Sequence, residues 1–230
     1  ADYEDFKVRK YGFHGTSHKY VSVVAAEVIG GEETKIIVCH LGNGASMSAV
    51  KNGKVVDTSM GLTPLQGLMM GTRCGDLDPA AVLYVMEKRG LDAAGMDKRM
   101  NKESGLLGIT GYSSDFRDIM KASKEGDERA KLAFEMFAYR VKSYIGAYSA
   151  AMGGVDAIAF TGGIGENAFE VREEICKGLE YLGVDFDFEK NTVRASGTVE
   201  LTKPNSKVKV LKIETAEELM IANDTYRLGK

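Results

Sequence analysis

The stretch "TKIIVCHLGNGASMSAVKNGKVVDTS", residues 34–59, contains three β-type segments separated by two glycine turns. The first segment is a compact run rich in β-branched residues, and it ends at a Gly-Asn-Gly turn. The second and third segments flank Asn52-Gly53. Asn-Gly between two apolar runs is the strongest short hairpin signal, because a type I′ turn requires positive φ at both central residues. The stretch therefore predicts three consecutive strands, the last two joined by a hairpin.

Helix and strand patterns alternate on both sides of these strands. Before them, "SHKYVSVVAAEVIGG" (17–31) predicts a helix with Ser or Thr as its N-cap residue and the two glycines as its end. After them, an amphipathic run from about Asp127 to Met152 predicts a long helix. "VDAIAFTGGIGEN" (155–167) and "KVKVLKIETAEELMIANDTYR" (207–227) then each predict a buried strand followed by a helix. This order predicts an α/β fold, with one mixed sheet, helices packed against it and ligand-binding loops at the strand ends.

The composition disfavours several classes of protein. Thirty Lys and Arg residues nearly balance 33 Asp and Glu residues, giving a net charge of -3, so a nucleic-acid partner is not expected. No apolar run approaches the ~20 residues that a membrane span requires. The three cysteines are far apart and have no metal-ligand spacing, which disfavours a disulfide framework or a zinc site. We expect a soluble, cytoplasmic protein with no membrane partner.

Three glycine-rich turns are candidates for binding phosphate, namely "HLGNGAS" (40–46), "GTRCGD" (71–76) and "FTGGIGEN" (160–167). Glycine lets backbone amides approach a phosphate closely, and a turn that opens a helix adds the positive end of the helix dipole. Ordinary strand-to-helix turns have a similar composition, so each turn alone leaves both interpretations open. None of the three matches the Gly-Lys-Ser/Thr phosphate loop or the full dinucleotide-binding pattern.

Two groups of side chains could act on an anion. The guanidinium of Arg73, in "GTRCGD", could bind phosphate or carboxylate with two hydrogen bonds, or it could pair with Asp76 or Asp78 at the surface. "FHGTSH" holds His14 and His18, two of the three histidines in the chain. They could bind a metal, act on a phosphate or as an acid/base pair, or be a helix-capping histidine and a bystander. The metal is the least favoured of these roles, because His14 precedes the predicted helix.

Two predicted helix starts carry further candidates. In "SSDFRD" (113–118), Ser114 or Asp115 would be the N-cap residue, and the same loop could hold a nucleoside. In "IETAEELMIA", Thr215 and Glu218 form a predicted capping box, which leaves Glu217 without a structural role. Glu217 would lie near the end of the preceding strand, where it could meet a magnesium-bound phosphate. A solvated helix face is the commoner role for such a glutamate.

Together, "RKYGFHGTSH", "HLGNGAS", "DTSMGLTPLQGLMMGTRCGD", "SSDFRD", "FTGGIGEN" and the "AEELMIA" helix resemble the acetate kinase (acetokinase) family along nearly the whole chain, in the family's order and spacing. The resemblance implies the ribonuclease H-like fold of the superfamily that contains acetate and sugar kinases, heat-shock ATPases and actin. It also implies reversible phosphoryl transfer between ATP and acetate, giving acetyl phosphate and ADP, with Mg²⁺ as cofactor.

The resemblance further implies roles for individual residues. His14 would hydrogen-bond the phosphoryl group in flight, and Arg73 would bind its oxygens. Phe13 and Pro64 would line part of the acetate pocket, and Glu217 would be the magnesium-associated glutamate. The other histidine of "FHGTSH" is expected to support the local structure. The residues implied in nucleotide binding are His40, Gly42, Asn43, Gly44, Asp115, Phe116, Arg117, Gly163, Ile164, Gly165 and Asn167.

Members of this family carry an additional N-terminal domain of the same superfamily type. Its magnesium-associated asparagine, second substrate-binding arginine and catalytic aspartate have no counterpart in this chain. We therefore expect residues 1–230 to be the C-terminal nucleotide-binding domain, to fold, and to catalyse little or nothing alone. The resemblance implies a homodimer formed through this domain, with the N-terminal domain of the same enzyme as a further partner. Two alternatives remain open, a propionate kinase on the same fold and a non-catalytic, actin-like nucleotide-binding module.

Overall fold

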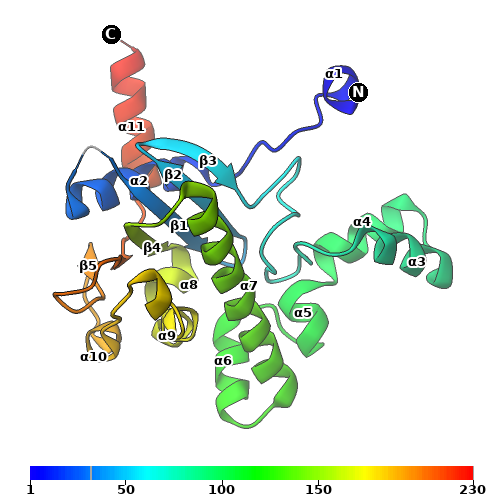
Figure 1. The fold of residues 1–230 in the computed structure, drawn as a ribbon. Helices are drawn as coiled ribbons and strands as arrows, with labels where there is room; N and C mark the ends of the chain where they lie inside the picture. The colour runs from blue at the N-terminus through cyan, green and yellow to red at the C-terminus, as the bar shows by residue number, and fades with distance from the viewer. Residues whose placement is uncertain (32, 230) are drawn as a thin grey trace. The chain divides into compact units, whose positions relative to one another are not determined.

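The computed structural model describes residues 1–31 and 33–229, and the chain divides into two compact units (Figure 1). The sheet unit comprises Phe13–Gly42, Ser46–Thr58 and Val141–Lys230. The helical unit comprises Ala1–Gly12, Asn43–Ala45 and Ser59–Arg140. Each unit therefore combines segments that are far apart in the sequence.

The sheet unit is built on a six-stranded mixed sheet with the strand order β3-β2-β1-β4-β6-β5. Strands β1 and β4 are parallel, as are β4 and β6, whereas β2–β3 and β5–β6 pair antiparallel. The strands are β1 (Lys35–Leu41), β2 (Ala45–Lys51), β3 (Lys54–Thr58), β4 (Ala157–Thr161), β5 (Val199–Glu200) and β6 (Lys209–Lys212). The predicted mixed sheet with flanking helices is confirmed.

The hairpin between β2 and β3 forms at the predicted dipeptide. Asn52 and Gly53 have φ of 52° and 71°, the positive values that a type I′ turn requires. The Asn52 side chain also accepts a hydrogen bond from the Thr34 N–H at 2.9 Å, which ties the turn to the start of β1. The sequence signal and the observed backbone agree.

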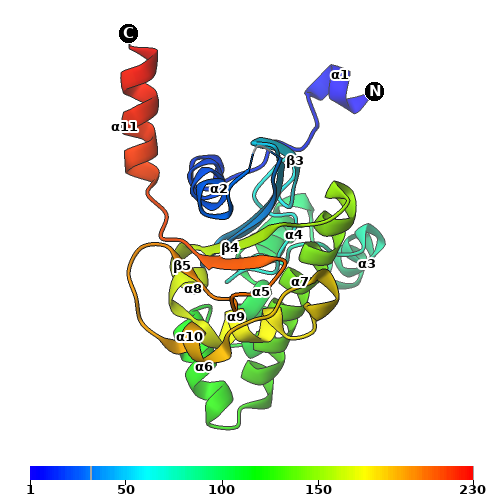
Figure 2. The same cartoon turned by 60° about the vertical axis from the view of Figure 1, so that its left-hand side comes forward.

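Helix α2 (Gly15–Ile29) packs on one face of the sheet, and its Val21 and Ala25 are completely buried among strand residues such as Ile36 and Leu211. Figure 2 shows α2 on one side of the central strands and α8 (Gly162–Asn167) on the other. The central strands are thus buried on both faces, as is usual for parallel strands. The predicted Ser or Thr cap is wrong, because the N-cap residue is His14.

The sheet unit also contains the helices that follow β4 and β6. They are α9 (Phe169–Cys176), the 3₁₀ helix η1 (Glu180–Leu182), α10 (Phe188–Thr192) and α11 (Glu217–Leu228). The predicted capping box at the start of α11 is wrong: the N-cap residue is Ala216, and no side chain caps the helix. The Thr215 hydroxyl instead donates to Ser17 Oγ at 2.9 Å, and this bond takes it away from the helix end.

The helical unit has its own buried apolar side chains, which include Met60, Leu68 and Met70. The methionines near the glycine-rich segment thus belong to a core. Asp115 is the N-cap residue of α6, where its carboxylate accepts from the Arg117 N–H at 2.9 Å. The helices are α1 (Asp2–Phe6), α3 (Pro79–Arg89), α4 (Ala93–Lys102), α5 (Gly105–Thr110), α6 (Phe116–Lys124) and the first part of α7 (Glu128–Met152). The long helix predicted from Asp127 to Met152 is therefore confirmed.

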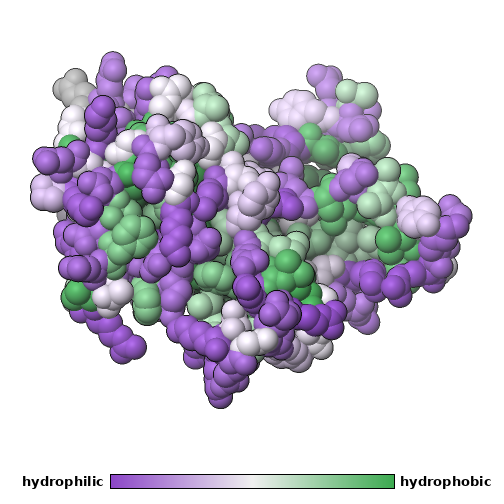
Figure 3. All heavy atoms as spheres, turned by 60° about the horizontal axis from the view of Figure 1, so that its bottom comes forward, coloured by the Kyte–Doolittle hydropathy of each residue, from purple (hydrophilic) through white to green (hydrophobic). Residues whose placement is uncertain are grey.

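The surface mixes polar and apolar side chains. Over the face that Figure 3 draws, charged and polar residues are interspersed with apolar ones. Within residues 1–31 and 33–229, no helix combines the length and the apolar character needed to cross a membrane.

Candidate active site

All three histidines lie together in the sheet unit. The ring of His14 stacks on that of His40, with centroids 4.2 Å apart and an interplanar angle of 16°. The centroid of His18 lies 6.4 Å from that of His14 and 6.2 Å from that of His40. His14 and His18 are close in the sequence, whereas strand β1 brings His40 to them. The cluster thus joins the start of α2 to the end of β1.

Buried serines hold the ring nitrogens of this cluster. Ser46 Oγ lies 2.8 Å from His14 Nδ1 and 2.7 Å from His18 Nε2, and Ser48 Oγ lies 2.8 Å from His18 Nδ1. Both serines are on β2, two residues apart, so they face the same side of the sheet. The sequence reasoning missed them. Their signal is a pair of polar residues at alternate positions of a strand that is otherwise apolar up to Lys51.

Burial keeps part of this cluster uncharged. Burial, together with the neighbouring His40 and His14, lowers the pKa of His18 to about 3. Burial also lowers the pKa of His40 below its usual value. His18 is therefore neutral at pH 7, and with both ring nitrogens hydrogen-bonded it supports the local structure, as expected.

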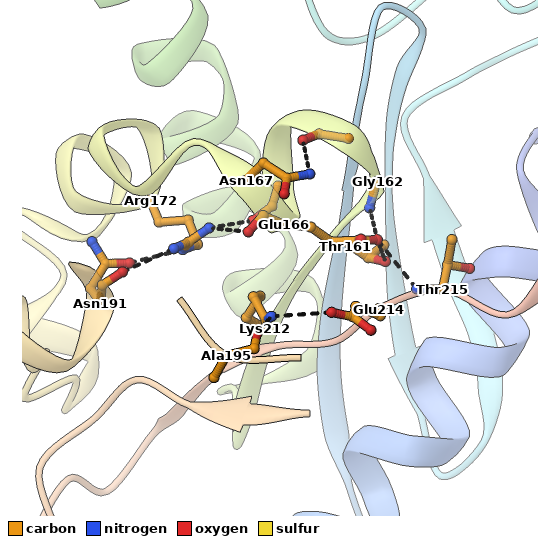
Figure 4. A network of polar contacts seen from close by, with 12 residues as sticks. Thr161, Gly162, Glu166, Asn167, Arg172, Asn191, Ala195, Lys212, Glu214 and Thr215 are labelled. Atoms are coloured by element: carbon orange, nitrogen blue, oxygen red, sulfur yellow. Dashed lines mark hydrogen bonds and ion pairs between the residues drawn. The ribbon is translucent and has the colours of Figure 1, made fainter. Parts of the chain in front are cut away.

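A second polar network lies where β4 and β6 end (Figure 4). The carboxylate of Glu166, in α8, accepts from the N–H of Gly162 at 2.9 Å and from the N–H of Thr215 at 3.2 Å. Thr215 then donates through its hydroxyl to Ser17, whose Oγ lies 2.8 Å from Nδ1 of His40. Hydrogen bonds therefore run from α8 to the histidine cluster without interruption.

The glycines of "FTGGIGEN" lie in the first turns of α8, where a loop was expected. Gly162 has a φ of 77°, and a Cβ there would lie 2.8 Å from the Leu41 carbonyl oxygen, so this position requires glycine. The predicted nucleotide-binding residues Gly163, Ile164, Gly165 and Asn167 are all in this helix. Gly163 is exposed with open space around it, Gly165 is buried, and Asn167 donates to the Gly163 carbonyl at 2.9 Å.

Arg172, in α9, fixes the end of α8 and was not singled out from the sequence. Its Nη1 donates to the carbonyls of Gly165 and Glu166 at 2.8 and 2.9 Å, and its Nε donates to Asn191 Oδ1 at 2.8 Å (Figure 4). Burial lowers the pKa of Arg172 to about 10. An isolated arginine in a predicted helix carries no signal that distinguishes this role from a solvated one.

The carboxylate predicted to meet magnesium belongs to Glu217, the first residue of α11, which is half-buried. Among the residues that the structure describes, no group of three or more His, Cys, Asp or Glu could hold a metal ion. Mg²⁺ is often held by only one or two carboxylates together with substrate phosphates. A single carboxylate at the start of a helix is compatible with that kind of site.

The helical unit holds the predicted anion-binding arginine. Arg73 Nη1 donates to the Pro64 carbonyl at 2.5 Å, and burial lowers the pKa of the Arg73 guanidinium below its usual value. Of the two aspartates considered as surface partners of Arg73, Asp76 pairs with Arg140 at 3.6 Å and Asp78 caps α3. The guanidinium is therefore held by backbone and is partly desolvated.

Glycines shape the chain around Arg73. Gly75 has a φ of 70°, and a Cβ there would lie 2.5 Å from the carbonyl oxygens of Gly67 and Leu68. The N–H of Gly71 donates to the Asn43 carbonyl at 3.0 Å, and a side chain at Gly71 would clash with the Asn43 amide. At Gly75 the loop packs backbone against backbone, which only glycine permits.

In the "SSDFRD" segment, the structure limits the role predicted for one residue, Phe116. The ring of Phe116 is buried in the helical unit, with its centroid 5.2 Å from that of Phe137, so any nucleotide contact at this residue is limited to its backbone. Asp115 and Arg117 are at the surface and form an ion pair of 2.6 Å with each other.

The remaining predicted site residues are Phe13, Pro64 and the turn after β1. Phe13 lies before His14 and is half-buried, and Pro64 is exposed. The turn of Gly42, Asn43 and Gly44 follows β1, with Asn43 exposed and both glycines half-buried.

Comparison with known proteins identifies the family of this chain. The family model described as "Acetokinase family" matches residues 1–223. The chain belongs to the acetokinase family. Its relatives in this family include the acetate kinase of Fusobacterium nucleatum, to which it is 66% identical over 230 residues, covering 100% of the chain and 58% of the relative.

Solved structures of the acetokinase family show the same fold. The chain matches the crystal structure of Porphyromonas gingivalis acetate kinase with a TM-score of 0.96 and 51% identity, covering 99% of this chain and 58% of that one. It matches a propionate kinase from Francisella tularensis with a TM-score of 0.90 and 44% identity, covering 97% and 57%. The predicted fold of the acetokinase family is confirmed, and the chain spans less than three fifths of the length of these relatives.

Proposed function

We propose that this chain is the C-terminal nucleotide-binding part of an acetate kinase, which transfers a phosphoryl group reversibly between ATP and acetate. The observation that carries the proposal is membership of the acetokinase family, with 66% identity to an acetate kinase across the whole chain. In the reaction, a carboxylate oxygen of acetate forms a bond to the γ-phosphorus of ATP, and the bond from that phosphorus to the bridging oxygen of ADP breaks.

The chemistry requires positioning and positive charge more than a covalent nucleophile. The transition state of phosphoryl transfer is loose and spreads negative charge over three oxygens. In the proposal, His14 and Arg73 supply hydrogen-bond donors to those oxygens. The stacking of His14 on His40 and its bond to Ser46 support this role, because a donor whose geometry is already set loses little entropy when it binds.

The proposed nucleotide-binding residues are given for each unit separately. In the helical unit it uses Asn43, Gly44, Asp115, Arg117 and the backbone of Phe116. In the sheet unit it uses His40, Gly42 and α8, where the open space around Gly163 would let a phosphate approach the backbone. Phe13 and Pro64 would contact acetate. Glu217 and the nucleotide phosphates would hold Mg²⁺, which when bound supplies positive charge to the phosphates.

The decisive experiment measures acetyl phosphate formation from Mg-ATP and acetate. We would assay this chain alone and after adding the part of the F. nucleatum enzyme that it does not cover. We expect little activity alone and turnover after reconstitution. In the reconstituted enzyme, Arg73→Ala should lower turnover by roughly 10³- to 10⁵-fold, the range found for arginine fingers.

Arg89→Ala is the matched control, because Arg89 lies in the same unit, at the exposed C-terminal end of α3. We expect it to leave turnover unchanged. Normal turnover of Arg73→Ala, in a sample whose circular dichroism matches the parent, would refute the role of Arg73.

A second candidate is a propionate kinase, because the chain also matches the propionate kinase of F. tularensis, at lower identity. Comparing kcat/KM for acetate and propionate in the reconstituted enzyme separates the two. ADP binding without acyl phosphate formation would instead indicate a non-catalytic, actin-like module. Because of the family resemblance, we also propose a homodimer and a cytoplasmic location. Sedimentation velocity tests the homodimer.

A further inference from the structure

Four side chains of the sheet unit form a hydrogen-bonded series, Ser48–His18–Ser46–His14. We propose that this series fixes the tautomer of His14, so that its ring hydrogen is on Nε2 and its Nδ1 is a hydrogen-bond acceptor. The inference deepens the proposed function, since His14 is proposed to donate to the phosphoryl group. Ser46 and His18 would then be positioning residues. The direction of each hydrogen bond follows from the surroundings of Ser48.

Ser48 is buried, and its hydroxyl has one hydrogen-bond partner within residues 1–31 and 33–229, the Nδ1 of His18 at 2.8 Å. If His18 donated here, the Ser48 hydroxyl hydrogen would be buried without an acceptor, which is strongly unfavourable. If Ser48 donates, its hydrogen is satisfied and only an oxygen lone pair is left over. The hydroxyl of Ser48 is therefore the donor, and His18 Nδ1 accepts.

The next step concerns His18, which is 4% exposed and neutral at pH 7. A neutral imidazole carries one ring hydrogen, and the other nitrogen is an acceptor. Because Nδ1 accepts from Ser48, the hydrogen of His18 is on Nε2. That nitrogen lies 2.7 Å from Ser46 Oγ, so His18 donates to Ser46.

The last step concerns Ser46, which is completely buried. Its oxygen accepts from His18, and its one hydrogen can point to His14 Nδ1 at 2.8 Å or to the Phe13 carbonyl at 3.5 Å. The shorter distance is the ordinary length of a hydrogen bond, whereas 3.5 Å is at its limit. Ser46 therefore donates to His14 Nδ1, and the ring hydrogen of His14 is on Nε2. The ring can then donate from Nε2 to a phosphoryl oxygen.

The other ring of the stack has a parallel arrangement. The Thr215 hydroxyl donates to Ser17 Oγ, and Ser17 Oγ lies 2.8 Å from His40 Nδ1. Each of the two stacked rings thus has a serine at its Nδ1. Ser17→Ala provides a matched control, because it removes the hydroxyl at Nδ1 of His40 and leaves the hydroxyl at Nδ1 of His14 in place.

The test is an NMR measurement of ring nitrogens in the chain labelled with ¹⁵N-histidine, which contains three histidines and hence three ring systems. At pH 7.5, two-bond nitrogen–hydrogen correlations distinguish the two tautomers. We expect both His14 and His18 to have the hydrogen on Nε2. A hydrogen on Nδ1 of either ring would overturn the proposal, whatever the fate of any variant.

The variant Ser46→Ala should shift the signals of His14 Nδ1 and His18 Nε2 and allow a second tautomer of His14. Ser17→Ala should shift the His40 signals and leave the His14 tautomer unchanged. If Ser46→Ala leaves His14 unchanged, Ser46 does not fix its tautomer and the proposal is wrong.

The reconstituted enzyme separates this inference from the proposed function. Ser46→Ala should lower kcat roughly tenfold, as loss of a supporting hydrogen bond typically does, with a smaller change in the KM for ATP. Ser46→Thr, which keeps the hydroxyl, should restore both kcat and the tautomer. An inactive parent with the expected tautomer refutes the proposed function alone. An active enzyme in which Ser46→Ala changes the tautomer but not kcat refutes the link between the tautomer and catalysis.

Discussion

His14 and Arg73, the two residues proposed to contact the phosphoryl group, are held in different ways. His14 lies in the sheet unit, where side chains hold its ring: Ser46 bonds Nδ1 and His40 stacks on its face. Arg73 lies in the helical unit, in a loop where Pro64 accepts from its guanidinium through a backbone carbonyl and where glycines such as Gly75 allow close backbone packing. The first residue depends on side-chain chemistry and the second on backbone geometry.

This difference predicts which substitutions each region tolerates. A polar network among buried side chains is sensitive to protonation and to the loss of a hydroxyl, because unpaired buried groups are costly. A loop packed through glycine is sensitive to any added Cβ, whatever its polarity. The predictions below probe the two regions separately.

The largest effect is expected for Gly75→Ala in the loop of Arg73. An alanine there combines a positive φ with a contact of 2.5 Å to two carbonyl oxygens. We expect a loss of about 3 kcal/mol in the free energy of unfolding from left-handed strain and overpacking together. Thermal unfolding should show Tm lowered by roughly 6–12 °C for a chain of this size.

Gly15→Ala is the control for Gly75→Ala. Gly15 begins α2, is exposed, and has nothing within 4 Å of an added Cβ. Because alanine is the better helix former, we expect a gain of at most about 1 kcal/mol. Equal Tm values for the two variants would mean that the loop is not packed through glycine.

A smaller effect is expected from the protonation of His18. Folding lowers its pKa to about 3 from an ordinary value of 6.5, because the ring is buried near His40 and His14. Between these values the unfolded chain binds a proton that the folded chain does not, so stability falls as the pH falls below 6.5. From pH 6.5 to pH 5 this should cost at most about 2 kcal/mol.

Urea unfolding at both pH values measures this loss, and His18→Gln provides the comparison. The variant has no proton to gain at this position, so its stability should change less between pH 6.5 and pH 5 than that of the parent. The same slope for both proteins would show that His18 does not carry the effect.

Local signals predicted the fold well, whereas the contacts of the candidate site depend on tertiary packing. The Asn52-Gly53 turn and the long helix were predictable, because each is encoded within a short window. His40 joins His14 only because β1 and α2 pack together, and no spacing in the sequence reports that contact. Thr215 matches a capping box, but Ser17 is the partner that its hydroxyl finds in the folded chain.

The same argument explains the outcome at Phe116. An aromatic residue just after a helix cap is compatible both with stacking on a base and with core packing. In the structure, α7 places Phe134 and Phe137 against the ring, so the ring packs in the core. Sequence reasoning had no access to that helix pairing, and so it included Phe116 among the nucleotide-binding residues without distinguishing ring from backbone.

The smallest effect is expected at Asp115, in the surface part of the helical unit. Arg117 lowers the pKa of Asp115 to about 2 through its hydrogen bonds to the carboxylate, but the arginine side chain is 91% exposed and solvent weakens the attraction. Asp115→Asn keeps an N-cap oxygen for the Arg117 N–H, so Tm should change by no more than about 2 °C. Asp115→Ala, which removes the cap, should cost about 1 kcal/mol. Scanning calorimetry of the two variants tests this difference. If Asp115→Asn destabilises as much as Gly75→Ala, the surface pair contributes far more than its exposure allows, and the contrast between buried and exposed parts of the site would fail.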